Sequence, residues 1–111
     1  MTQRLIDTCA LEEALDAFAD ARDWRQFHSP KNLAMALTGE VGELVEIFQW
    51  RSEQASWDVA RMPETAEHVR QELADVALYL VRLASVLGVD LNQAIADKMI
   101  LNAQKYPPLS R

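Results

Sequence analysis

The sequence has few of the residues that break helices and only one that can form a disulfide. It contains three glycines, four prolines and a single cysteine, Cys9, in 111 residues. So few helix breakers favour helices over a turn-rich sheet architecture. One thiol excludes an intramolecular disulfide and suits a reducing compartment. The length and the 50% hydrophobic content allow one hydrophobic core, so we expect a single domain over residues 1–111, with peripheral ends at 1–8 and 107–111.

Long apolar runs and excess positive charge are also missing, and both absences narrow the class of function. The most apolar stretch, Val76–Val89, is too short to span a bilayer and is interrupted by Arg82. The segment Met1–Leu15 contains acidic residues and no long apolar run, so it is not typical of a secretory signal. We therefore expect a cytoplasmic protein without a membrane partner. The formal net charge of −6 argues against binding a nucleic-acid polymer, whereas a divalent cation can still bridge the protein to a small polyphosphate.

Apolar periodicity and capping signals predict an all-α fold. Helices are expected over residues 9–22, 30–50, 63–87 and 91–106. The segment Arg51–Met62 lacks sustained periodicity and is interpreted as a connector that can hold a short helical turn around Trp57. The third helix carries an apolar stripe typical of a bundle seam, made of Val69, Leu73, Val76, Leu80, Leu83 and Leu87. Four helices with mostly short joins indicate a four-helix antiparallel bundle.

Two pairs of carboxylates lie on the second and third predicted helices. Glu40 and Glu43 are spaced i, i+3, as are Glu72 and Asp75, so each pair shares one helical face. Glu40 also interrupts an apolar stripe, which is costly for a carboxylate unless it is paired or bound to a metal. Two such pairs on facing helices can surround one cation, and their oxygens favour Mg²⁺ or Mn²⁺ over zinc. For either pair alone, an ordinary solvated face is the alternative.

Aromatic and polar side chains flank these pairs at helical spacing. Trp50 and Tyr79 follow the carboxylates on the same two helices and are candidates for stacking a base, with a core role as the alternative. On the fourth helix a cation, an amide and a phenol share one face, namely Lys98, Asn102 and Tyr106. Lys98 can meet phosphate oxygens and Asn102 can read a base edge, unless this face is simply solvated. His28, in the loop before the second helix, is similarly open to both interpretations.

Two glycines and a second histidine lie beside the carboxylates. Gly39 and Gly42 stand inside the second helix, where each costs about 1 kcal/mol relative to alanine. Close approach of a neighbouring helix would compensate for this cost; in the functional version of this interpretation, the same approach brings the carboxylate pairs together. His68 precedes Glu72 by one helical turn, and we expect a surface or hydrogen-bonding role for it rather than metal ligation.

Three segments carry a resemblance to a known family. They are DWRQFHSPKNLAMALTGEVGELVEIFQW from Asp23 to Trp50, QELADVALYLVRLA from Gln71 to Ala84, and KMILNAQKYP from Lys98 to Pro107. Together they resemble the MazG-like all-α nucleotide pyrophosphohydrolases over nearly the whole chain. The motifs GEVGEL, FQW and KMxxN narrow the resemblance to the branch of the dCTP pyrophosphatases. The connector around Trp57 departs from the family pattern.

The resemblance implies an enzyme, a nucleoside triphosphate pyrophosphohydrolase that cleans the nucleotide pool. Water would attack the α–β phosphoanhydride of dCTP or a modified dCTP to give a nucleoside monophosphate and pyrophosphate. The implied Mg²⁺ ligands are Glu40, Glu43, Glu72 and Asp75, and Glu43 is our candidate for the general base. The implied nucleotide pocket consists of Trp24, His28, Trp50, Tyr79, Lys98 and Asn102. Relatives assemble as dimers or tetramers with pockets completed by a neighbouring subunit, so we expect a homo-oligomer.

Two other functions are compatible with the same residues. One is the same chemistry on dUTP or on a broad set of nucleoside triphosphates, since base choice depends on pocket shape. The other is a non-enzymatic helical assembly module, which would show neither Mg²⁺-dependent stabilisation nor pyrophosphate release. The number of metal ions and the choice between dimer and tetramer are left open by the sequence.

Overall fold

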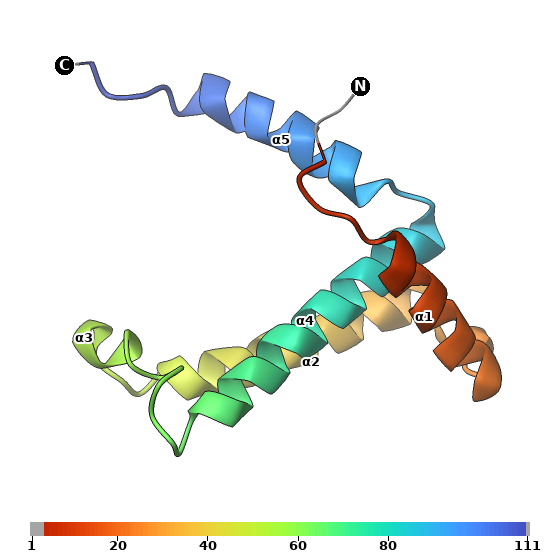
Figure 1. Ribbon diagram of the computed structural model, residues 1–111, viewed down its shortest axis with the longest axis horizontal. Helices are drawn as coiled ribbons and strands as arrows, with labels where there is room; N and C mark the ends of the chain where they lie inside the picture. Colours follow the sequence, from red (N-terminus) through yellow and green to blue (C-terminus); the bar gives the residue numbers. More distant parts are fainter. Residues whose placement is uncertain (1–3, 111) are drawn as a thin grey trace.

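The computed structural model describes residues 4–110, and these residues form helices joined by short turns, without any strand. The elements are α1 (Cys9–Ala21), a 3₁₀ turn (Arg25–Phe27), α2 (Pro30–Phe48), α3 (Glu53–Ser56), α4 (Ala66–Leu87) and α5 (Leu91–Lys105) (Figure 1). The predicted all-α class is confirmed. None of these helices combines the length and the hydropathy that crossing a membrane requires. The predicted peripheral ends include residues 1–3 and 111, which lie outside the described residues.

The ends of the long helices are set by local capping chemistry. The Ser29 hydroxyl accepts the Asn32 N–H at 3.1 Å and begins α2. Gly88 ends α4 with a φ of 70°, in the left-handed region where glycine carries no steric penalty. The carboxylate of Asp90 accepts the Gln93 N–H at 3.1 Å and begins α5. These starts and stops agree with the sequence prediction.

The main packing is between α2 and α4, which run antiparallel along each other (Figure 1). α1 packs against α4 as well. The buried apolar side chains therefore come mostly from these three helices, and they include Ala19, Leu33, Ile47, Val69 and Val81. This pairing positions the carboxylates of α2 opposite those of α4.

The segment between α2 and α4 closes one end of the helix pair. α3 begins where the Ser52 hydroxyl accepts the Ala55 N–H at 3.1 Å. Val59, which follows α3, packs in one cluster with Ile47 and Val69. The predicted short helical turn is thus present just before Trp57, and the connector contributes to the core.

α4 begins at Ala66 rather than at the predicted Pro63. The cause lies in Thr65, whose hydroxyl donates to the Val59 carbonyl at 2.6 Å. This bond ties the chain before α4 to the connector, so the backbone at Pro63 forms turns instead of a first helical turn.

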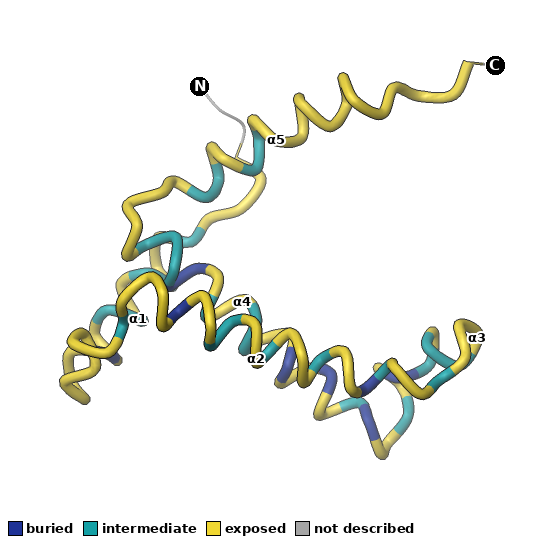
Figure 2. The backbone as a smooth tube through the Cα atoms, turned by 180° about the vertical axis from the view of Figure 1, so that it is seen from behind, coloured by how far each residue is buried: buried dark blue, intermediate teal, exposed yellow. Residues whose placement is uncertain are grey.

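α5 lies apart from the α2–α4 pair (Figures 1 and 2). None of its residues is buried, and Met99, Ile100 and Leu101 are all more than half exposed. Its first turn is tied to the amino-terminal segment, because the Asn92 side-chain oxygen accepts the amides of Leu5 and Ile6 at 2.8 and 3.1 Å. The four predicted helices exist, but within one copy the fourth does not close the bundle.

The predicted seam of α4 is wrong for a single chain, because its residues divide between two faces. Val69 is buried and Val76 and Leu83 are half-buried, whereas Leu73, Leu80 and Leu87 are 54%, 42% and 54% exposed. The exposed leucines repeat every seventh residue and form one strip, which we call the α4 leucine strip (Leu73, Leu80 and Leu87). α2 covers only one side of α4, so this strip has no partner within the described chain.

The close approach predicted at the two glycines of α2 is also wrong within one chain. A Cβ atom built on Gly39 or Gly42 would meet nothing within 4 Å. The carboxylates are brought together by the α2–α4 pairing itself, whose contacts lie on the face that carries Leu33 and Ile47.

Candidate metal centre and adjoining cavity

Three carboxylates meet where α2 faces α4. Glu40, Glu43 and Glu72 each place one oxygen so that the three oxygens lie within 4.8 Å of one another. Glu40 projects from the packed face of α2 and is half-buried, and Glu72 is only 6% exposed, whereas Glu43 is exposed. The antiparallel pairing thus assembles most of the ligand set predicted from the sequence.

Asp75, the fourth predicted ligand, lies next to this cluster without belonging to the group of three. It stands one turn beyond Glu72 on α4 and borders the adjoining cavity. Its negative charge raises the pKa of both Glu40 and Glu72, after the larger effect of burial. Asp75 therefore adds negative charge to the surroundings of the cluster and lies between the cluster and the cavity.

The cluster is electrostatically strained. Burial is the main cause that raises the pKa of Glu40 to about 7, followed by a hydrogen bond shared with Glu72 and by the neighbouring charges, of which Glu43 is the largest. Burial also raises the pKa of Glu72. The Oε2 atoms of Glu40 and Glu72 are buried and have no hydrogen-bond partner among the described residues.

The unsatisfied oxygens of Glu40 and Glu72 fit the requirements of a metal ion. Buried carboxylate oxygens without donors are costly, and a divalent cation would satisfy them while reversing the repulsion. The donors are all hard oxygens, which suits Mg²⁺ or Mn²⁺. His68 lies at the edge, with its Nε2 atom 3.5 Å from Glu72 Oε1 and its side chain 54% exposed. That position agrees with the expected surface or hydrogen-bonding role.

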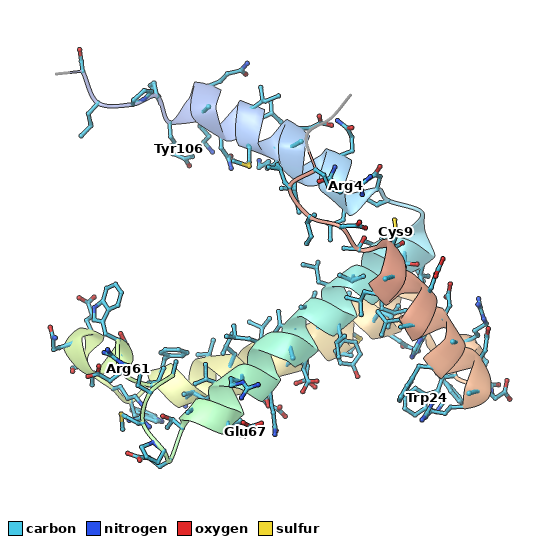
Figure 3. All side chains as sticks on the ribbon, viewed as in Figure 1. Arg4, Cys9, Trp24, Arg61, Glu67 and Tyr106 are labelled. Atoms are coloured by element: carbon cyan, nitrogen blue, oxygen red, sulfur yellow. The ribbon has the colours of Figure 1, made fainter. Side chains whose placement is uncertain are left out.

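A cavity of about 170 Å³ opens beside Asp75, between α1 and α4. It brings together three of the predicted nucleotide-binding residues, Trp24, His28 and Tyr79. Trp24 lies near the end of α1 (Figure 3), where its ring stands edge-on to Phe18 with centroids 5.6 Å apart and lies 6.1 Å from the His28 ring. Aromatic rings thus form much of the cavity wall, and Asp75 is the predicted ligand that borders it.

The other predicted pocket residues lie elsewhere in a single chain. Trp50 is 89% exposed, just beyond the end of α2. Lys98 and Asn102 are exposed on α5, which lies apart from the α2–α4 pair (Figure 1). Tyr106, directly after the end of α5, is exposed as well. One copy of the chain therefore assembles only the part of the predicted pocket that α1 and α4 provide.

Several residues of the cavity were missed by the sequence reasoning. The most informative is Arg82, which is 4% exposed and donates from Nε to His28 Nδ1 at 3.0 Å. Its position contained a signal, because Asp75, Tyr79 and Arg82 are spaced i, i+4, i+7 and share one face of α4. The remaining missed residues are apolar walls whose pattern resembles any core: Leu15, Phe18 and Leu78.

Comparison with known proteins connects this site to a family. Residues 36–109 match the model of the MazG-like family. The chain is 51% identical to dCTP pyrophosphatase 1 of Mus musculus over 90 residues, which cover 81% of this chain and 53% of that protein. It is 47% identical to the Homo sapiens protein of the same name, with the same coverage. The chain thus spans about half the length of these relatives.

A solved structure supports the same relationship over the full fold. A crystal structure of a pyrophosphatase from Archaeoglobus fulgidus matches with a TM-score of 0.84 and 37% sequence identity. The match covers 97% of this chain and 99% of that chain. The family match takes in α4, α5 and the carboxylate cluster. The chain therefore belongs to the MazG-like family.

Proposed function

We propose that the chain is a single-domain, Mg²⁺-dependent nucleoside triphosphate pyrophosphohydrolase that acts on dCTP or a modified dCTP. The product pair would be a nucleoside monophosphate and pyrophosphate, formed by hydrolysis at the α–β phosphoanhydride. The observation that carries the proposal is a strained carboxylate cluster with two unsatisfied oxygens, beside which Asp75 borders an aromatic cavity. The similarity to proteins named dCTP pyrophosphatase supports the choice of base. We place the activity in the cytoplasm, where nucleoside triphosphates are made and used.

All four carboxylates would bind the metal, and one of them would also accept a proton. Glu40, Glu43, Glu72 and Asp75 would hold Mg²⁺, which supplies charge neutralisation for the polyphosphate and lowers the pKa of a bound water. Among them Glu43 is exposed, so it can reach a water on the substrate side. We assign Glu43 as the base that accepts the proton of the attacking water.

The cavity would take the base and sugar. In this proposal Trp24 and Tyr79 provide aromatic faces, and the triphosphate extends past Asp75 to the carboxylates. Lys98 would meet phosphate oxygens and Asn102 would read the base edge, while Trp50 covers the open side. None of these three residues lines the cavity of its own chain, so they would act from a second copy.

Exposed apolar surface supports assembly into a dimer or tetramer. The α4 leucine strip and Met99, Ile100 and Leu101 of α5 are exposed in one copy, and monomers rarely expose large contiguous apolar patches. A heptad-spaced strip is the pattern that pairs with a second helix. A second copy that covers it would also complete the bundle that one chain leaves open.

The assembly proposal predicts that Leu80→Glu shifts the full chain toward monomer in sedimentation experiments. A carboxylate in the middle of the strip would be buried without a partner in the interface. Ala74→Glu is the matched control, since it adds the same charge to an exposed position of α4 outside the strip. A wild-type protein that sediments as a monomer at all concentrations would rule out this assembly.

Pyrophosphate release across the canonical nucleotides, deoxy and ribo, tests the activity. We expect release from dCTP in the presence of Mg²⁺ and none after chelation. Equal or faster release from dUTP, or from all triphosphates, would favour the alternative of a different or broader substrate range. The absence of release from every nucleotide would favour the non-enzymatic assembly module.

A further inference from the structure

Arg82 places a buried charge in the most apolar part of α4. Arg82 is 4% exposed, so its guanidinium must be paired, because an unpaired buried charge is strongly unfavourable. Its partners come from two other elements, Asp16 on α1 and His28 in the loop before α2. One side chain therefore ties together the three segments that enclose the cavity.

The planar guanidinium serves both partners at once. One terminal nitrogen of Arg82 forms an ion pair with Asp16, and Nε donates to His28 Nδ1 at 3.0 Å. Asp16 is also 3.5 Å from a terminal nitrogen of Arg25, which is exposed and pairs with Asp20. A lysine at position 82 would present one ammonium group and could not reproduce this forked arrangement.

The Arg82 bond decides which nitrogen of His28 carries the proton. A guanidinium N–H can only donate, so the Nδ1 atom that accepts it must be unprotonated. The neutral ring then has its proton on Nε2, and that N–H is its only remaining polar function. Burial first, and then the charge of Arg82, lower the pKa of His28. Both effects keep the ring neutral near pH 7.

Arg82 and the carboxylate of Asp75 lie at two ends of the same stretch of α4. Arg82 lies two helical turns from Asp75, about 10 Å along the axis. Both residues border the same cavity, together with His28. If the phosphates of a nucleotide lie at the Asp75 end, its base reaches the end where His28 and Arg82 meet.

We propose that Asp16 and Arg82 are positioning residues that hold His28 as an Nε2–H donor toward a hydrogen-bond acceptor on the base of the nucleotide. The identity of the ligand rests on the proposed function, whereas the state of the His28 ring does not. Arg82 acts through His28, so its removal frees Nδ1 and allows the ring to turn and to exchange tautomers. The ligand group selected in this way is an acceptor such as a ring nitrogen or a carbonyl oxygen of a pyrimidine.

Long-range ¹H–¹⁵N spectra of the histidine-labelled full chain test the ring directly. Only two histidines are present, and His28→Ala assigns the signals. In the wild type we expect an unprotonated Nδ1, a protonated Nε2 and a pKa below the ordinary value of about 6.5. In Arg82→Met the pKa should rise and the two tautomers should mix. Arg25→Met is the control, because the Arg25 side chain contacts Asp16 but not the His28 ring, and its bond to the His28 N–H runs through the backbone carbonyl, which the substitution keeps.

Nucleotide kinetics with the same variants test the consequence. Arg82→Met should raise KM for the preferred nucleotide about tenfold, the size of one lost hydrogen bond in a binding site. The change in kcat should be smaller, because the carboxylates are untouched. If Arg82 acts through His28, Arg82→Met in the His28→Ala background should add nothing to KM. Asp16→Asn offers a milder second variant if Arg82→Met does not fold.

The outcomes separate this inference from the proposed function. An unchanged His28 spectrum in both Arg82→Met and Asp16→Asn would overturn the positioning role. Effects on KM that multiply in the double variant would show that Arg82 acts independently of His28 and would overturn it as well. If the wild type releases no pyrophosphate from any nucleotide, the proposed function fails, and the spectra alone decide whether Arg82 sets the state of His28.

Discussion

Glu43→Gln should lower kcat by about a hundredfold or more, the range expected when a positioned general base is lost. Glutamine keeps the shape of the side chain and one of its two oxygens, so most of the packing and part of the metal coordination remain. What it loses is the ability to accept a proton. The dissociation constant of a non-hydrolysable nucleotide analogue should therefore change by less than about threefold at saturating Mg²⁺.

The measurement compares turnover and binding in the same protein. Glu46→Gln is the matched control, because Glu46 is exposed on α2 one turn beyond Glu43 and lies outside the carboxylate cluster. Its kinetics should equal those of the wild type. Equal losses of turnover and of nucleotide binding in Glu43→Gln would instead make Glu43 a ligand only, and the base would have to be sought elsewhere.

The carboxylate cluster could be predicted from the sequence because its information is local. An i, i+3 pair fixes a shared helical face whatever the rest of the chain does. Glu40 also stood within an apolar stripe, and the structure places it on the packed face of α2 with a raised pKa. Three helix ends were predictable for the same reason, since Ser29, Gly88 and Asp90 act through bonds or dihedral angles a few residues away. The start of α4 was not, because Thr65 bonds to the Val59 carbonyl of the connector.

The packing of helices against one another was less predictable, because periodicity indicates an apolar face without naming its partner. The α4 seam divides into residues that meet α2 and leucines that remain uncovered. α5 shows the same limit, since its pattern predicted a helix correctly but not its separation from the α2–α4 pair.

The pairing of Arg82 is a second feature that the sequence could not predict. In the sequence Arg82 interrupts an apolar stretch and shares a helical face with Asp75 and Tyr79, but neither observation names the groups that pair with it. Its partners Asp16 and His28 come from distant parts of the chain, so only the fold reveals that this charge is buried and paired.

Without Mg²⁺, the free energy of unfolding should fall as the pH rises, because the carboxylate cluster of Glu40, Glu43 and Glu72 then becomes charged. The pKa of Glu40 is raised from 4.5 to about 7 in the folded chain. The folded state therefore binds its proton more tightly than the unfolded state does. The stabilisation that protonated Glu40 gives the folded state is fully present below pH 4.5. It is lost as the pH rises toward about 7. Above that pH the metal-free cluster carries uncompensated negative charge.

Glu72→Gln isolates this effect from the titration of all other carboxylates. Near pH 8 without metal, the variant should melt at a higher temperature than the wild type, because one buried negative charge has been removed. The difference between the two melting temperatures should shrink as the pH falls from about 7 toward 4.5. Glu46→Gln should follow the wild type throughout, since its side chain is exposed.

Adding Mg²⁺ at pH 8 should reverse the order of the two proteins. At about one hundred times the dissociation constant, the ion should raise the melting temperature of the wild type by about 10 °C. The same addition should leave Glu72→Gln nearly unchanged, because a buried ligand is missing from the site. If Mg²⁺ stabilises both proteins equally, the ion binds elsewhere and the cluster is not the metal centre. If it stabilises neither, the raised pKa of Glu40 reflects a proton shared between carboxylates, and the metal-dependent chemistry proposed for this site is wrong.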